Sequence, residues 1–242
     1  MKPNLRFLIL VSTLCVSTAW SQALFDFYPT DAEWTTMPQY CKARYVVSST
    51  GRSSKWAYDF PPAEIESWQS RLGSCWGMAH HQCAGTVHLN RAKATTGSAR
   101  RFELERAQDE LRYAAKSCPS SNPFSATLQT TLAMVYVEQG RKTEAMATLD
   151  AAIAANPGTD STYIAKSIIL KREGKAMQGR EVLLQGLEAT NGGTAELHNA
   201  LGLSYFDTKE YEKARQHARK AYGMGYPLPG LKNRLAKAGY PL

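Results

Sequence analysis

The chain has 242 residues, of which 43% are hydrophobic and 21% are charged, a composition typical of globular proteins rather than disordered ones. No stretch is long and apolar enough to cross a bilayer, so we expect no transmembrane segment. The formal net charge is +8, but no nucleic-acid-binding motif accompanies it, which excludes nucleic acid as an expected partner.

The first residues have the features of a secretory signal peptide. Lys2 and Arg6 precede the apolar run FLILVSTLCV, and Ser21 and Ala23 occupy the small-residue positions before a cleavage site. We therefore predict a signal peptide over residues 1–23 and an exported mature chain, either periplasmic or secreted. Four cysteines then remain in an oxidising compartment, which predicts two disulfides rather than free thiols.

Residues 24–70 are rich in aromatic side chains and match no family. Two prolines at positions 61 and 62 interrupt the chain, and AEIESWQSRL after them predicts a short helix. We expect an irregular arm that covers one end of the helices that follow. The aromatic residues of the arm and its border are Trp34, Tyr40, Tyr45, Trp56, Tyr58, Phe60, Trp68 and Trp76. The alternative interpretation is an aromatic platform that binds sugars.

Residues 71–125 predict a divergent hairpin of two antiparallel helices. The first helix covers about 75–95 and contains MAHHQCAG, with Gly85 at a position of close helix approach. The segment TTGSAR forms the turn, and the second helix covers 101–117. Four residues identify the second helix by a spacing that recurs further along the chain: Ala107, Leu111, Ala114 and Pro119.

The hairpin limits which cysteines can pair. Cys75 and Cys83 on one helix would lie about 12 Å apart, beyond the ~7 Å between Cα atoms that a disulfide allows. In an antiparallel hairpin the start of the first helix lies beside the end of the second, so Cys75 pairs with Cys118. Cys83 is then left for Cys41, and this bond ties the arm to the hairpin.

The histidines near Cys83 raise the question of a metal site. A zinc site would need ligands three or four residues apart, as in the HExxH pattern, which is absent. His81 and His88 lie two helical turns apart, and an oxidised Cys83 offers no thiolate. We predict no metal ion and no cofactor, and we expect His80, His81 and His88 to pack and hydrogen-bond against residues 24–70.

The clearest periodicity begins with the 34-residue unit at 126–159. Its alanines let two antiparallel helices approach, Tyr136 and Leu149 fill the space between them, and Pro157 ends the second helix. Gly140 makes the turn of the hairpin. The order and spacing of this unit resemble the tetratricopeptide repeat (TPR), and they rest on Leu132-Ala133, Tyr136, Ala145, Leu149, Ala152 and Pro157.

Two further units and a final helix follow. Unit 160–193 has Gly179 and Gly186 where the first unit has alanine, which predicts a softer hairpin because each glycine lowers helix stability by up to ~1 kcal/mol. Unit 195–228 restores the pattern, and residues 229–242 predict a capping helix. We therefore predict an all-α, right-handed solenoid of helical hairpins, with three TPR units in 126–228, a C-terminal cap and a disulfide-tethered N-terminal arm.

The resemblance is to exported bacterial TPR proteins, and it implies a concave groove that binds a protein partner. An apolar groove suits an amphipathic helix or a hydrophobic peptide segment, whose orientation Lys171 and Arg172 would set. The family's groove positions correspond here to Thr130, Met134, Val137, Glu138, Ile164, Ile168, Lys171, Arg172, Asn199, Leu203, Phe206 and Asp207. The alternative is that Met134, Ile168 and Leu203 only pack into adjacent repeats.

No nucleophile–base pair, phosphate-binding loop or pair of acids supports catalysis, so we predict no catalytic residues and no enzyme activity. The favoured function is an exported adaptor in the assembly or maintenance of a cell-envelope complex, such as a pilus, secretion or polysaccharide-export machine. The alternative is a module that binds carbohydrate or an envelope polymer through the aromatic arm and a basic C-terminal face, which suits an anionic surface. That face consists of Lys209, Lys213, Arg215, Arg219, Lys220, Lys232, Arg234 and Lys237, opposed only by Glu210 and Glu212.

Overall fold

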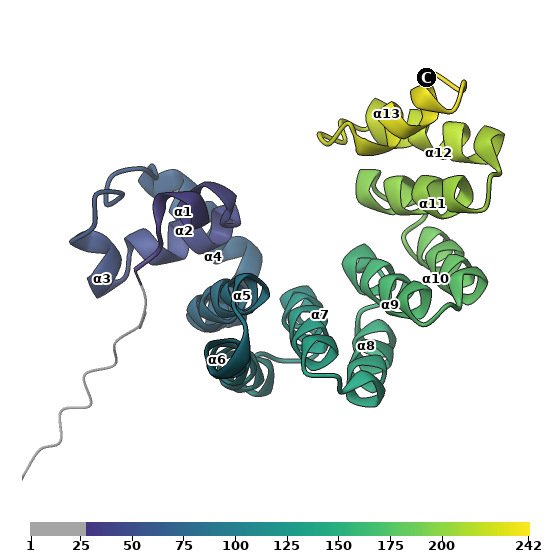
Figure 1. Cartoon of the computed structure of the whole chain (residues 1–242). Coiled ribbons are helices and arrows are strands. Elements are labelled where there is room, and N and C mark those ends of the chain that lie inside the picture. Colours follow the sequence, from purple (N-terminus) through teal and green to yellow (C-terminus); the bar gives the residue numbers. More distant parts are fainter. Residues whose placement is uncertain (1–27) are drawn as a thin grey trace, which may run out of the picture.

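The computed structural model describes residues 28–242, and the predicted signal peptide lies outside this range. Every regular element of residues 28–242 is helical. Figure 1 shows these helices following one another along a curved arc from α1 to α13. The elements are α1 (Asp31–Thr36), α2 (Gln39–Val46), α3 (Ser49–Arg52), α4 (Pro62–Leu72), the 3₁₀ helix η1 (Gly73–Met78), α5 (Ala79–Ala94), α6 (Gly97–Ser117), α7 (Pro123–Glu138), α8 (Lys142–Ala155), α9 (Asp160–Arg172), α10 (Ala176–Ala189), α11 (Ala195–Asp207), α12 (Tyr211–Gly223) and α13 (Gly230–Lys237).

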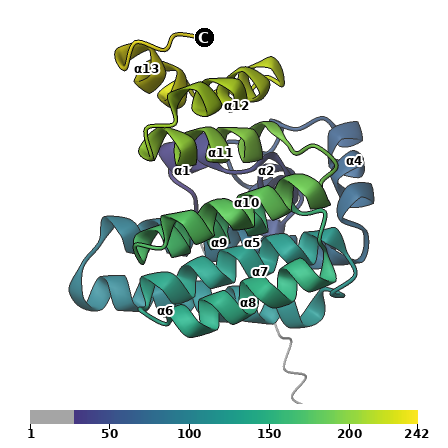
Figure 2. The same ribbon diagram turned by 90° about the vertical axis from the view of Figure 1, so that its right-hand side faces the viewer.

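Successive helical hairpins form the arc, and α13 closes it. The pairs α5–α6, α7–α8, α9–α10 and α11–α12 stack one upon the next, and α5, α7 and α9 lie on the concave side of their pairs (Figures 1 and 2). Helix α13 buries Leu231 and Leu235 against Ala214 and Ala218 of α12. The predicted all-α solenoid with a C-terminal cap is confirmed.

Small buried residues let the two helices of a hairpin approach closely. In α7–α8, Ala133 and Ala145 have no exposed surface, and the buried Leu149 fills the adjoining space. Between the two helices Gly140 has a φ of +78°, which glycine adopts at little cost, and its N–H donates to the carbonyl of Val137. The sequence pattern of alanines, leucine and turn glycine therefore corresponds to a closely packed pair.

The glycines of α10 have a packing role that helix propensity does not reveal. A Cβ atom on Gly186 would lie 2.8 Å from Cγ of Tyr163, and one on Gly179 would lie 2.9 Å from the carbonyl oxygen of Ser167. Neither distance is open to a real Cβ, so only glycine allows α9 and α10 to pack this closely. We expected a softer hairpin because glycine has a low helix propensity. That expectation did not include the closer packing of α9 and α10 that the glycines allow.

The first hairpin differs in detail from the prediction. Cys75 lies in the 3₁₀ helix η1 rather than in α5, and α6 starts at Gly97, so that much of the predicted turn is helical. The cysteines nevertheless form the two predicted pairs. Cys41 bonds to Cys83 and Cys75 to Cys118, with Cα–Cα distances of 5.6 and 5.1 Å.

The N-terminal segment is more helical than the irregular arm we expected, because α1, α2 and α3 precede the predicted helix α4. A capping box between Thr30 and Glu33 starts α1. Glu33 also accepts a 2.7 Å hydrogen bond from Nε of Arg91 in α5, and Cys41 anchors α2 to the same helix. The segment is thus fastened to the first hairpin by an ion pair and a disulfide.

The aromatic residues of this segment pack mainly against one another. Trp34 is 9% exposed and stacks on Trp56 with ring centroids 4.6 Å apart, and Tyr45 is fully buried beside them. Tyr40 contacts Phe124 of α7, edge to face, at 5.3 Å. These rings form a small core that joins the segment to the solenoid.

The packing of α9 against α10 predicts an unusual response to a glycine-to-alanine substitution. Gly186→Ala lowers the free energy of unfolding by about 1–3 kcal/mol, because the new methyl group overlaps Tyr163, although alanine is the better helix former. Urea denaturation measures the change. The matched control is Gly223→Ala in α12, where a Cβ meets nothing within 4 Å and stability is equal or slightly higher. A Gly186→Ala chain as stable as the unsubstituted chain would contradict the close approach.

Candidate partner-binding site

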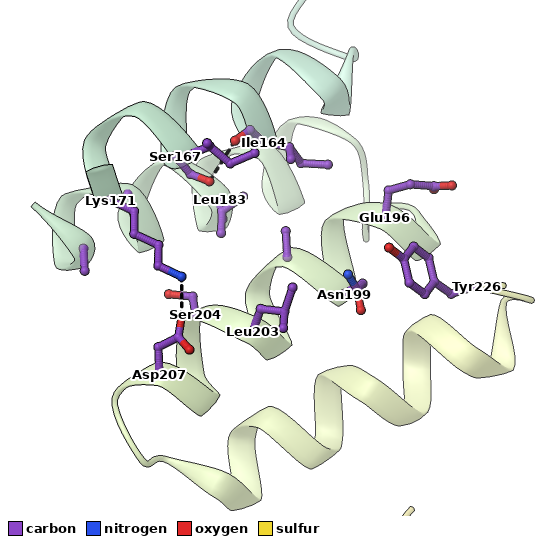
Figure 3. Close-up of a pocket in the computed structure, with 14 residues that line it drawn as sticks. Ile164, Ser167, Lys171, Leu183, Glu196, Asn199, Leu203, Ser204, Asp207 and Tyr226 are labelled. Carbon is purple, nitrogen blue, oxygen red and sulfur yellow. Dashed lines mark hydrogen bonds and ion pairs between the residues drawn. The ribbon is translucent and has the colours of Figure 1, made fainter. Parts of the chain in front are cut away.

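A pocket of about 360 Å³ opens between α9, α10 and α11. Helices α9 and α11 are the first helices of successive hairpins and form opposite walls, and the segment between α12 and α13 adds one residue (Figure 3). The lining residues are Ile164, Ser167, Ile168, Lys171, Ala176, Gly179, Leu183, Glu196, Asn199, Ala200, Leu203, Ser204, Asp207 and Tyr226. The pocket therefore lies on the concave side of the arc, where the first helices of the hairpins face inward.

Small side chains on α10 and α11 leave the space empty. Ala176 and Gly179 line it from α10, and Ala200 lines it from α11. Behind the pocket the buried Arg180 holds the two helices at a fixed separation. Its guanidinium donates to the carbonyl oxygen of Ser204 at 3.1 Å and to Oε1 of Glu210 at 2.5 Å. The cavity is thus built into the packing of two repeats.

The walls of the pocket are apolar and accessible. Ile164 projects from α9, Leu203 projects from α11, and Leu183 closes the inner side (Figure 3). Ile168 of α9 also lines the pocket. Ile168 is 39% exposed, although it lies on the concave side of a well-packed repeat. An accessible apolar surface in a recess is a common feature of binding sites for proteins or ligands.

One end of the pocket carries a network of charged side chains. Lys171 of α9 forms an ion pair with Asp207 at the end of α11, and Nη2 of Arg234 in α13 donates to the same carboxylate at 2.6 Å. Burial raises the pKa of Asp207, but the hydrogen bonds from Lys171 and Arg234 outweigh it, so the net pKa lies below its ordinary value. Asp207 is therefore charged and binds both cations.

Polar groups of a different kind lie at the opposite end. Glu196, Asn199 and Tyr226 gather there, as Figure 3 shows. Asn199 is buried and lies beside Tyr226 (Figure 3). Burial raises the pKa of Tyr226, and the negative charge of Glu196 adds to this effect, so the phenol stays neutral. The exposed carboxylate of Glu196 forms no ion pair with any residue in the described part of the chain.

The structure gathers half of the predicted groove residues in this pocket. They are Ile164, Ile168, Lys171, Asn199, Leu203 and Asp207. Lys171 is not the free cation that we expected to orient a partner, because Asp207 neutralises it. Arg172 lies outside the pocket, 3.7 Å from the carboxylate of Glu138.

The other predicted groove residues have contacts within the solenoid. Met134 and Val137 of α7 pack against the core between the first two clear repeats, as the alternative interpretation proposed for Met134. Thr130 hydrogen-bonds the hydroxyl of Thr162 at 3.1 Å. Glu138 accepts a hydrogen bond from Arg100, and Phe206 lies beneath the guanidinium of Arg234, 4.3 Å from its centre. These five side chains lie outside the pocket.

The pocket residues that α10 and the final loop contribute were not predicted from the sequence. Gly179 and Ala176 could have indicated the pocket, because small residues on the second helix of a hairpin leave space beside the first helices. Nothing in the sequence indicated that Tyr226 lines the pocket, because it lies in the loop MGYPLP between α12 and α13, outside the repeat pattern. The sequence does not distinguish Glu196 from other exposed acidic residues. Only the structure shows that it lines the pocket.

His81 and His88 of the first hairpin bind glutamates of α6, two contacts that the sequence did not predict. Nδ1 of His81 lies 2.5 Å from Oε2 of Glu110, and Nδ1 of His88 lies 2.6 Å from Oε2 of Glu103. These contacts join α5 to α6. Burial first, and then the charges of His81 and of Arg44 in α2, lower the pKa of His80 to about 4.

Within residues 28–242, no three His, Cys, Asp or Glu side chains gather closely enough to hold a metal ion. In the same range no helix has both the length and the apolarity needed for a membrane crossing.

The basic C-terminal face is partly neutralised. Lys213 binds Glu210 at 2.8 Å and Arg215 binds Glu212 at 2.7 Å, while Lys209, Arg219, Lys220, Lys232 and Lys237 form no ion pair with described residues.

A second pair of histidines lies between α11 and α12. Nδ1 of His198 and Nδ1 of His217 are 3.0 Å apart, a hydrogen bond that requires at least one neutral ring. Burial is the main cause that lowers both pKa values, to about 4 for His217, and the nearby charge of Lys220 acts in the same direction. The pair is thus neutral in the folded chain at neutral pH.

A family model described as tetratricopeptide repeat matches residues 100–159 and 165–227, just over half of the chain. The solved structure of TTC0263, a thermophilic TPR protein of Thermus thermophilus, is 19% identical with a TM-score of 0.42, covering 70% of this chain and 97% of that one. MamA MSR-1 C2 is 16% identical with a TM-score of 0.38, covering 73% and 88%. No curated protein matches the chain.

The buried histidines predict that mild acid destabilises the chain. The unfolded rings take up protons below about pH 6.5 while folded His217 does not until about pH 4, so stability present at pH 7 is lost as the pH falls towards 5. We expect His217 to contribute about 1 kcal/mol of this loss, after allowance for its partial exposure. Urea denaturation of the chain and of His217→Gln at pH 7 and pH 5 measures it. An equal loss in both proteins would contradict this role for His217.

Proposed function

Because this chain belongs to the tetratricopeptide repeat family, we propose that it is an exported, non-catalytic adaptor that holds a protein partner on the concave side of its repeats. The partner contributes an amphipathic helix or a hydrophobic segment, and the adaptor acts in the assembly or maintenance of a cell-envelope complex such as a pilus, secretion or polysaccharide-export machine. Repeats of this family generally serve as scaffolds for protein interaction.

The observation that carries this proposal is the accessible apolar pocket between α9 and α11. Ile168 and Leu203 lie in its walls with part of their surface exposed, and no helix in the described part of the chain covers them. A helix laid between α9 and α11 would bury these side chains without rearranging the repeats. Affinity would then come mainly from the removal of apolar surface from water.

Two features support export. Four cysteines in the described residues form two disulfides, which persist in oxidising compartments and are rare in the cytosol. The first residues have the charge and apolar pattern of a signal peptide. A chain that folds after translocation also gains stability from the disulfides, roughly 4 kcal/mol each in the chain-entropy model.

The alternative function, carbohydrate or polymer binding, has less structural support. Trp34, Trp56, Tyr45 and Tyr40 face one another in a small core, so they do not form an open platform. Among the aromatic residues of this segment that the structure describes, Tyr58 and Tyr28 are exposed, at 98% and 74%. The unpaired lysines of the C-terminal face would still allow a weak contact with an anionic surface.

Substitution of Leu203 tests whether the pocket holds the partner. Leu203→Asp puts a charge in the apolar wall, and we expect at least a tenfold loss of partner captured by crosslinking in the native envelope. The matched control is Leu184→Asp, the same change at a 39% exposed position of α10 outside the pocket. Circular dichroism verifies that both variants fold. Equal capture by the chain and by Leu203→Asp would contradict the proposal.

If the chain is exported, its mature form has a predictable N-terminus and a predictable number of free thiols. Cleavage after Ala23 gives an N-terminus at Leu24 and a chain with no free thiol, because the four remaining cysteines are paired. Mass spectrometry of the protein from the periplasm or medium, with and without reduction, measures both properties. Recovery of a chain from Met1 in the cytoplasm, with reactive thiols, would overturn this part of the proposal.

A further inference from the structure

The two ends of the pocket differ in charge. At the Lys171 end, two cations share the carboxylate of Asp207, which leaves one positive charge in excess. At the other end, the carboxylate of Glu196 has no ion-pair partner in residues 28–242. Leu203 of the apolar walls lies between these ends (Figure 3), and Ile168 lines the same pocket. A segment bound in the pocket therefore meets a negative charge at one end and a positive charge at the other.

The neighbours of Glu196 cannot neutralise it. Tyr226 is the nearest titratable group in the pocket, and burial and the charge of Glu196 both raise the pKa of its phenol, which keeps it neutral. Asn199, which lines the same end of the pocket, is uncharged. A positive charge from outside the chain is what this end of the pocket lacks.

The separation of the two ends sets the length of the occupant. Glu196 and Asp207 are eleven residues apart on α11, which corresponds to about 16 Å or three helical turns. A helix of three to four turns would cover the apolar walls and reach both ends. Its apolar side chains would follow the three- and four-residue spacing of an amphipathic helix.

We propose that the partner segment is an apolar helical face that carries one lysine or arginine placed against Glu196. This inference rests on the proposed function, because it assumes that the pocket holds a protein segment. The cation would pair with Glu196 at the pocket mouth, and the excess positive charge three turns away would repel it from the opposite end. Charge thus fixes the direction and register of the segment, while the apolar walls supply most of the affinity.

A peptide selection on the oxidised mature chain tests this inference. Random 16-residue peptides displayed on phage are selected for binding, and the enriched peptides are synthesised for affinity measurement by fluorescence anisotropy. We expect an apolar helical pattern with one basic residue at a constant position. Glu196→Gln weakens binding about fivefold, and Glu196→Lys weakens it tenfold or more. Replacement of the basic residue by glutamate in the peptide restores binding to Glu196→Lys.

Two further variants separate the possible outcomes. Glu181→Lys makes the same charge change on α10 outside the pocket and leaves affinity unchanged. Peptides that lose affinity with Leu203→Asp but not with either Glu196 variant would overturn the charge preference alone. Peptides indifferent to Leu203→Asp, or a selection that enriches no binder, would overturn the proposed function and this inference with it.

Discussion

Close contact between the two helices of each hairpin is the constraint on which the rest of the structure depends. Alanine and glycine at the contact positions bring the helices together, as Gly186 against Tyr163 and Gly85 against Leu111 illustrate. A bulkier residue at either position would push the helices apart and change the stacking of all later repeats. The concave surface and its pocket are consequences of this packing, because both lie where successive first helices face one another.

The parts of the fold that depend on this close contact could be predicted from the sequence. Repeat spacing at Ala145, Leu149 and Ala152 predicted the hairpins, and the hairpin geometry predicted which cysteines pair. These inferences succeeded because a helix places residues at fixed intervals on a fixed face, so that spacing along the chain determines position in space.

Contacts between distant helices could not be predicted in the same way. The pairing of Lys171 with Asp207, and of His81 with Glu110, depends on how two repeats or helices sit against each other, which the spacing within one repeat does not specify. The N-terminal segment follows no repeat, so its helices and their aromatic core gave no periodic signal. Long-range electrostatics therefore decided the charge of the pocket, whereas local pattern had suggested a free basic pair.

The central claim is that a partner occupies the concave pocket, and footprinting measures this most directly. Carbene labelling of the mature chain, alone and crosslinked to its native partner, compares the accessibility of apolar side chains on the two sides of the solenoid. The account predicts that Ile168 and Leu203 lose label in the complex while Met177 and Leu184 of α10, which are 57% and 39% exposed, keep theirs. Protection of Met177 and Leu184 with unchanged labelling of Ile168 and Leu203 would contradict it.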